Sequence, residues 1–268
     1  MNFFSKRLLS PISTVLRTSM NSRHIWSKAV IITEAGEPSE VARVYNVNLG
    51  ELPKNKVLIK MLVAPINPSD KNQIQGVYGV KKDVQEYSVL DSADQLDSGA
   101  STTISGFVPG NEGVGVISEI GSEAGNAVNG PLKVGDIVVP VKYNSLGSWN
   151  NYIVAEPNLF AVIRDTESLT PEHIGSIKVN ASTAYRMLKD IVSLKPGDVV
   201  IQNGANSGAG QILIQLAHLW GYKTINVVRD RPDFSTLEKS LLDLGADVVI
   251  KENELGDPNI IKSSLEKL

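Results

Sequence analysis

The sequence contains no cysteine among its 268 residues. This absence excludes disulfide bonds, cysteine-ligated zinc, iron–sulfur clusters and a thiolate nucleophile. Histidine is also scarce, since only His24, His173 and His218 are present, and their spacing is not that of metal ligands. A metal site is therefore not expected.

Long apolar runs and an excess of positive charge are missing as well. No stretch approaches the roughly 20 apolar residues of a membrane-spanning helix. The formal net charge is −3, which gives no electrostatic reason to expect binding to nucleic acid. With 42% hydrophobic and 21% charged residues, the composition is typical of a soluble globular protein that is long enough for two modest domains.

The first 33 residues contain no acidic side chain, although they carry five basic residues and six serines. Four apolar residues there fall on one helical face: Phe4, Leu8, Ile12 and Leu16. This composition is typical of a mitochondrial transit peptide, which we place at residues 1–28, and a disordered basic tail is the alternative. Without that segment, 21 basic residues would face 29 acidic ones, a net charge of −8. We therefore expect an acidic mature protein in the mitochondrial matrix.

Residues 29–169 are dominated by short runs rich in valine and isoleucine, which turn residues separate. Such runs predict β-strands. The predicted strands fall within residues 28–33, 56–67, 112–121, 136–141 and 150–156. Residues 81–106 are polar, acidic and rich in serine, which predicts a long loop or lid.

The pattern changes near Thr170, where Thr170–Pro171–Glu172 is a helix-start signal followed by apolar residues at spacings of three and four. Beyond it, strands are predicted at Val199–Gln202, Thr224–Val228 and Val248–Ile250, and a helical segment follows each one. Strands that alternate with helices indicate parallel βαβ units. The sequence therefore predicts an α/β protein, with a β-rich domain at 29–169 and part of a doubly wound sheet at 170–268.

A glycine-rich turn lies between the first of these strands and its helix. Gly204, Gly208 and Gly210 would let the backbone approach a pyrophosphate, and the helix N-terminus would supply free N–H groups. The pattern is not a strict G-x-G-x-x-G, because Ala205 and Ser207 occupy the first two glycine places. A dinucleotide site is favoured, and a glycine turn without a ligand is the alternative.

The second strand of the unit ends in Arg229–Asp230–Arg231. An acid at this place holds the ribose 2′-hydroxyl of NAD, whereas arginine favours the 2′-phosphate of NADP. Two guanidinium groups here indicate NADPH. Asp230 leaves two alternatives open, since it could serve NAD or pair with neighbouring residues.

Several motifs together carry a resemblance to a known family. The segment "GNEGVG" stands where zinc-dependent medium-chain dehydrogenases have a "GHE" triplet. Five separated motifs agree in order: "INPSDKNQIQGVYG", "VPGNEGVG", "VNASTAYRML", "QNGANSGAGQ" and "VVRDRPDF". Over residues 29–268 the chain resembles the mitochondrial trans-2-enoyl-thioester reductases, in their fungal form. These are zinc-free members of the medium-chain dehydrogenase/reductase superfamily.

The resemblance implies a GroES-like catalytic domain followed by a Rossmann domain that binds NADPH. It implies reduction of trans-2-enoyl thioesters, carried by acyl carrier protein or CoA, in mitochondrial fatty acid synthesis by a homodimer. It also assigns site residues. Tyr78 matches the catalytic tyrosine, and the positions that match cofactor contacts are Asn180, Asn206, Ser207, Gly208, Ala209, Arg229, Asp230 and Arg231.

A tyrosine suits this chemistry. Addition of hydride to Cβ of an enoyl thioester develops negative charge on the thioester oxygen, and a phenol, which stays protonated at neutral pH, can donate to that oxygen or to Cα. Four other residues have two interpretations each. Asn67 and Asp70 could lie near the nicotinamide or form a turn; Glu112 could be catalytic, but a buried structural carboxylate is favoured; and Trp149 could line an acyl pocket, but core packing is favoured.

The C-terminal half departs from the family pattern. A doubly wound dinucleotide fold has about six strands, and three are predicted here. We therefore expect either a C-terminally truncated fragment or a chain that has lost activity. A zinc-free NADPH quinone oxidoreductase and a non-catalytic nucleotide-binding protein are the alternative functions.

Overall fold

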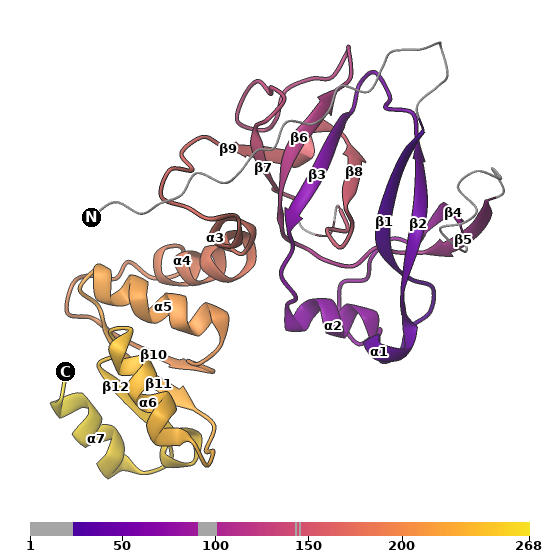
Figure 1. Ribbon diagram of the computed structural model, residues 1–268. Helices are drawn as coiled ribbons and strands as arrows, with labels where there is room; N and C mark the ends of the chain where they lie inside the picture. Colours follow the sequence, from indigo (N-terminus) through magenta and orange to yellow (C-terminus); the bar gives the residue numbers. More distant parts are fainter. Residues whose placement is uncertain (1–23, 91–100, 143, 145) are drawn as a thin grey trace, which may run out of the picture.

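The structure is a computed structural model that describes residues 24–90, 101–142, 144 and 146–268. Most of the predicted transit peptide lies outside the described residues. Strand β1 begins at Ile25, within the last residues assigned to that peptide, and Ser27 is buried. The described chain forms an N-terminal lobe of antiparallel strands and a C-terminal lobe in which helices surround a small parallel sheet (Figure 1).

Two antiparallel sheets build the N-terminal lobe. The first has the order β1-β2-β4-β5, formed by Ile25–Ile32, Ala42–Gly50, Gln85–Leu90 and Thr102–Gly106. The second has the order β8-β3-β6-β7-β9, formed by Tyr152–Ala155, Val57–Val63, Val114–Ile120, Ile137–Pro140 and Phe160–Ile163. Single bridges, such as Ala29 with Asn150, connect the two sheets.

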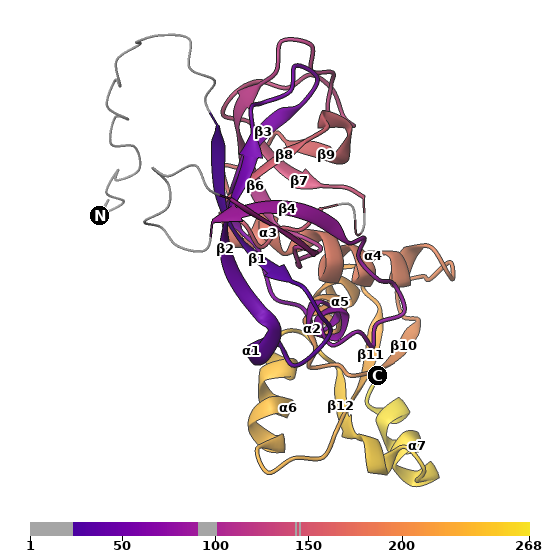
Figure 2. The ribbon, with the colours of Figure 1, turned by 90° about the vertical axis from the view of Figure 1, so that its right-hand side faces the viewer.

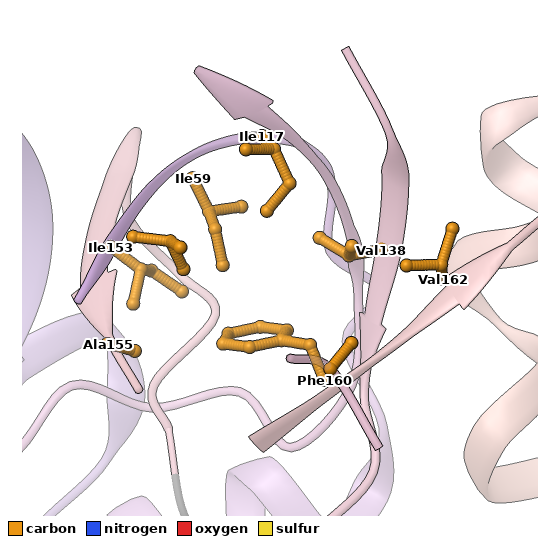
Figure 3. Packing of buried hydrophobic residues seen from close by; sticks show 9 residues of the cluster. Ile59, Ile117, Val138, Ile153, Ala155, Phe160 and Val162 are labelled. Carbon is orange, nitrogen blue, oxygen red and sulfur yellow. The ribbon is translucent and has the colours of Figure 1, made fainter. Parts of the chain in front are cut away.

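The inward faces of the second sheet enclose a single apolar core. Alternation along each strand turns every second side chain inward, which places Ile59, Ile117 and Val138 opposite one another (Figure 3). The ring of Phe160 extends into the space between them and is 2% exposed. Burying an aromatic side chain this fully contributes several kcal/mol to a core, roughly 3–5 when it is truncated to alanine.

All five predicted strands of this lobe are present, and four further strands were not predicted. The prediction of a long loop at 81–106 is wrong in part, because β4 and β5 pair with each other across Tyr87 and Ile104. These strands are polar because they form an outer part of the sheet, where many side chains face water. Two short helices complete the lobe: α1 at Pro38–Val41 and α2 at Pro68–Ile74.

A helical connection leads from the N-terminal lobe to the second lobe. Helix α3, Pro171–Gly175, begins as predicted with Thr170 as its N-cap, whose Oγ1 accepts a hydrogen bond from the backbone N of His173 at 3.4 Å. The helical pattern is not continuous, however. A π-helical turn at Ile177–Ala181 follows α3, and helix α4 occupies Ser182–Lys189. Such turns interrupt an α-helix and reorient the residues within it.

The second lobe contains the three predicted parallel strands. They are β10 at Val199–Asn203, β11 at Lys223–Val228 and β12 at Val248–Lys251, in the order β10-β11-β12. Helices α5 at Gly208–Leu219, α6 at Phe234–Asp243 and α7 at Pro258–Glu266 follow them in turn. None of the helices in the described ranges has the length and apolar character needed to cross a membrane.

Helices cover both faces of this sheet. Ile214 of α5 and Leu241 of α6 pack with Val228 and Val249 on one face. Ile260 and Ile261 of α7 pack on the other face, and Figure 2 shows α6 and α7 on opposite sides of β12. Strand β10 forms one edge of the described sheet.

Candidate active site

The glycine-rich turn connects β10 to α5 as the sequence predicts. Gly204 has φ +59°, in the left-handed region that favours glycine. Ser207 is the N-cap of α5, and its Oγ accepts the backbone N–H of Gly210 at 3.1 Å. A Cβ at Gly210 would lie 2.7 Å from the carbonyl oxygen of Ala205. Gly210 therefore allows the turn to pack tightly against the first turn of the helix.

A cavity of about 270 Å³ opens between this turn and the carboxyl end of β11. It brings together three of the predicted cofactor residues, Asn206, Ser207 and Arg229, and Glu252 also lines it. Gly208 and Ala209 start helix α5 beside it. The first amides of a helix have no acceptor within the helix, so this end of α5 presents N–H donors and a partial positive charge to the cavity.

Asp230 is engaged in an ion pair. Its Oδ1 lies 2.9 Å from Nζ of Lys251, the last residue of the neighbouring strand β12. The hydrogen bond from Lys251 lowers the pKa of Asp230, and Asp230 in turn raises the pKa of Lys251. Asp230 is thus paired with Lys251 of the adjacent strand, and not with the guanidinium groups of Arg229 or Arg231, its neighbours in sequence. Arg231 is half-buried and, unlike Arg229, does not line the cavity.

Asn180 lies against the start of α5. A Cβ at Gly208 would come within 3.2 Å of Cγ of Asn180, so the π-helical turn and the glycine turn are in contact. The Nδ2 group of Asn180 donates to Oδ1 of Asn67 at 3.1 Å, which connects the second lobe to the first. The structure thus places Asn180 beside the predicted phosphate loop, although the two are far apart in sequence.

Glu112 is fully buried at the junction of the two lobes. Its Oε1 accepts from Nδ2 of Asn67 at 2.7 Å, and its Oε2 accepts from the backbone N of Val179 at 2.8 Å. Lys178 donates to the carbonyl oxygen of Asn111 at 3.3 Å across the same junction. Glu112 is therefore a structural carboxylate that holds the π-helical turn, which was the favoured interpretation.

Asn67 is the N-cap of helix α2 and Asp70 lies in its first turn. For these residues the sequence suggested a place near the nicotinamide or a turn, and it did not predict the helix. The backbone N of Asn67 donates to Oδ2 of Asp70 at 2.8 Å. The opposite oxygen of Asp70 accepts from Nδ2 of Asn111 at 2.8 Å. Burial raises the pKa of Asp70, although the hydrogen bonds from Asn67 and Asn111 and the charge of Lys82 oppose that shift.

Tyr78 lies in the loop after α2 and is half-buried. Its backbone N donates to the carbonyl oxygen of Asn72 at 3.2 Å. The loop is fastened on its far side, where Lys82 Nζ donates to the carbonyl oxygens of Gly110 at 3.0 Å and Leu146 at 2.9 Å. Burial lowers the pKa of Lys82 to about 8, an effect that Asp70 opposes.

The surroundings of Trp149 agree with both of its interpretations, core packing and the lining of a pocket. It packs against the buried cluster around Ile31 and Val108, and its Nε1 donates to the carbonyl oxygen of Pro65 at 3.3 Å. It also lines a largely apolar cavity of about 630 Å³ together with Ile66, which is 76% exposed.

Comparison with known proteins agrees with this architecture. The alcohol dehydrogenase GroES-like domain family matches residues 53–164. Mitochondrial enoyl-[acyl-carrier-protein] reductase from Xenopus tropicalis is 40% identical over 234 residues, 87% of this chain and 59% of that protein. The human protein of the same name is also 40% identical, over 87% of this chain and 55% of its own length. The chain thus spans between half and two thirds of these relatives.

Solved structures give the same result. The mitochondrial 2-enoyl thioester reductase Etr1p/Etr2p heterodimer from Candida tropicalis aligns with TM-score 0.75 at 30% identity, over 91% of this chain and 66% of that one. A variant of Etr1p in complex with NADP and crotonyl-CoA aligns with TM-score 0.76 at 30% identity, over 91% of this chain and 67% of that one. The chain belongs to the mitochondrial enoyl thioester reductase family.

Membership of the enoyl thioester reductase family confirms the predicted α/β fold, with a GroES-like domain before a Rossmann-type sheet. Identity does not single out the fungal form, since the relative from Yarrowia lipolytica is 39% identical. A putative NADPH:quinone reductase from Bacillus thuringiensis aligns with TM-score 0.68 at 24% identity, which shows the fold alone.

Sequence reasoning missed two lysines of this candidate site. Lys251 could have been found, because carboxyl ends of neighbouring parallel strands meet at one edge, and Lys251 ends the strand beside Val228 in register. Lys82 gave no signal, since its burial depends on Gly110 and Leu146, which are distant in sequence.

Proposed function

We propose that the protein is an NADPH-dependent reductase that converts trans-2-enoyl thioesters to saturated acyl thioesters. The observation that carries this proposal is the cavity between the glycine turn and Arg229, beside an Asp230 carboxylate that Lys251 already engages. The names of the relatives supply the reaction class: they are enoyl-[acyl-carrier-protein] reductases, and one solved neighbour is an Etr1p/NADP/crotonyl-CoA complex.

The residues present fit a dinucleotide. The left-handed backbone at Gly204 and the close packing at Gly210 leave room for a pyrophosphate to approach the N-terminus of α5. Gly208 and Ala209 would donate backbone N–H groups to it, with Asn206 and Ser207 beside them. Arg229 and Arg231 would hold the 2′-phosphate, and Asn180 would contact the cofactor from the opposite side of the turn.

In the proposed reaction, Tyr78 is the catalytic residue. Bound NADPH supplies the hydride that adds to Cβ of the enoyl thioester. The phenol of Tyr78 donates a hydrogen bond to the thioester oxygen, where negative charge develops, or a proton to Cα. The loop that carries Tyr78 is fixed by Lys82 and by Asn144, whose Nδ2 donates to the carbonyl oxygen of Lys81 at 2.8 Å.

The cellular setting belongs to the same proposal. We place the protein in the mitochondrial matrix, with the domain boundary at 169/170. The transit peptide, predicted at residues 1–28, would have to end before Ile25, because residues 25–28 belong to strand β1 and pair with β2. The relatives are named as mitochondrial proteins, and the Candida tropicalis neighbour is a heterodimer, which supports a dimer of the proposed enzyme. Acyl carrier protein or CoA would carry the substrate in mitochondrial fatty acid synthesis.

Oxidation of NADPH in the presence of crotonyl-CoA tests the proposed activity. Tyr78→Phe should lower kcat by about 10²-fold or more while the Kd for NADPH stays constant, because one positioned proton donor contributes about that factor. Tyr185→Phe is the matched control, since it removes a hydroxyl from a half-exposed tyrosine of α4. Turnover of a quinone but not of crotonyl-CoA would refute the proposed enoyl thioester reductase activity. NADPH binding without turnover of either acceptor would indicate a non-catalytic nucleotide-binding protein.

A further inference from the structure

We propose that Lys251 determines the nucleotide specificity of this site, by engaging the Asp230 carboxylate so that the site accepts a 2′-phosphate. This inference rests on the proposed function, because it concerns the site in which NADPH would bind. An acid at the end of the second strand accepts hydrogen bonds from the ribose hydroxyls of NAD. Asp230 stands at that place in the sequence, yet its side chain has another partner in the structure.

The position of Lys251 follows from the register of the parallel strands. Val228 of β11 is paired with Lys251 of β12, and Asp230 lies two residues beyond Val228. The ammonium group of Lys251 therefore reaches Asp230 at the carboxyl edge of the sheet, with Nζ 2.9 Å from Oδ1. Lys251 Nζ also lies 4.9 Å from the ring centre of Phe234, the first residue of α6.

The other charged groups around this edge are accounted for as well. The Glu254 carboxylate accepts the backbone N–H of Lys251 at 2.7 Å and is thus occupied. Glu252 lines the cavity beside Arg229. Within the ranges that the structure describes, neither Arg229 nor Arg231 forms an ion pair through its guanidinium group, so both can bind a phosphate.

The charge balance then explains the preference. An unpaired carboxylate next to a 2′-phosphate would repel it, and the same carboxylate would be free to bind a 2′-hydroxyl. Lys251 removes both effects because it neutralises Asp230 and occupies one of its oxygens. Arg229 supplies the attraction for the phosphate, whereas Lys251 removes the opposing charge.

Measuring the Kd values of NADPH and NADH for the full 268-residue chain tests this role. Lys251→Met keeps most of the side chain's length but removes the cation that neutralises Asp230. The ratio of the NADH to the NADPH dissociation constant should fall by about tenfold, since an unpaired carboxylate repels a 2′-phosphate bound beside it. The double variant Lys251→Met/Asp230→Asn should return to within about threefold of the original ratio, because neither charge of the Asp230–Lys251 pair is left and Glu252 is unchanged.

Lys223→Met is a matched control. Lys223 forms an ion pair of similar length, 2.8 Å, with Asp247 at the opposite end of the same strands. Its loss should change stability but leave the nucleotide preference unchanged. If Lys251→Met binds NADPH and the ratio of the NADH to the NADPH dissociation constant is unaltered, this inference is overturned while the proposed function stands. The same holds if that ratio shifts in Glu252→Gln but not in Lys251→Met. Failure of the unmodified chain to bind either nucleotide would overturn both this inference and the proposed function.

Discussion

Replacing Glu112 by leucine should destabilise the protein strongly, because this carboxylate accepts two hydrogen bonds in a fully buried position. Leucine has a similar size but no acceptor. The Nδ2 group of Asn67 and the backbone N–H of Val179 would both lose their partner, and Lys178 would lose a favourable charge. Each buried donor without an acceptor costs about 1–3 kcal/mol, so the free energy of unfolding should fall by about 2–6 kcal/mol.

Thermal unfolding followed by circular dichroism measures this effect. A loss of about 4 kcal/mol corresponds to a decrease in Tm of about 8–16 °C for a chain of this size. Glu112→Gln should change the Tm much less, since rotated side-chain amides can satisfy both donors. Glu119→Leu, at an exposed position on strand β6, which begins two residues after Glu112, should change the free energy by no more than about 0.5 kcal/mol.

Hydrogen exchange gives a local readout of the same change. The amides of residues 177–181 should exchange faster in Glu112→Leu than in Glu112→Gln, because the bond to Val179 N fixes that π-helical turn. A Tm within about 2 °C of the original protein, together with unchanged exchange at 177–181, would refute the reasoning that Glu112 holds the junction.

Three further predictions concern separate parts of the molecule. Gly210→Ala should cost about 1–3 kcal/mol and weaken nucleotide binding, because the added methyl would overlap Ala205; chemical denaturation measures this against Gly256→Ala, where no atom lies within 4 Å. Phe160→Ala should lower the free energy of unfolding in urea by about 3–5 kcal/mol because it leaves a cavity in the apolar core of the second sheet, and a loss below about 1 kcal/mol would contradict the described packing. Lys82, whose pKa burial lowers from 10.5 to about 8, binds its proton more weakly in the folded state. The free energy of unfolding should therefore rise with pH between about 8 and 10.5, relative to Lys82→Met at each pH, and a flat difference would contradict the burial.

The second lobe was the more predictable part of the fold. Its strands at 199–203, 223–228 and 248–251 are short apolar runs between glycine turns and helix-start signals, so local pattern was sufficient. Strands β4 and β5 were missed because their stability comes from pairing with distant strands rather than from apolar alternation. The break between α3 and α4 was missed because contacts with Glu112, 67 residues away from Val179, help to fix it.

Some parts of the candidate site were likewise predictable from local sequence, and others were not. The phosphate loop was predicted because a glycine turn between a strand and a helix can be recognised from local sequence. Arg229 was predicted because it follows the second strand of the same unit. Tyr78 was selected only through the resemblance, since its loop is fastened by Lys82 and Asn144 through contacts distant in sequence. The ion pair between Asp230 and Lys251 depends on the register of β11 against β12, which the pattern of apolar residues in the sequence does not specify.

The junction between the lobes is polar, and this has a consequence for motion. Helix α3 packs on the N-terminal lobe, because Ile174 is in one buried cluster with Val114 and Val139. The bonds that cross the junction are hydrogen bonds: Val179 to Glu112, Asn180 to Asn67, and Lys178 to the carbonyl oxygens of Asn111 and Lys142. Water can replace each of them at a net cost of about 0.5–1.5 kcal/mol, so separating the lobes costs about 2–6 kcal/mol. An open state would then hold roughly one molecule in thirty to one in tens of thousands, so the arrangement in which the two lobes are in contact dominates in solution.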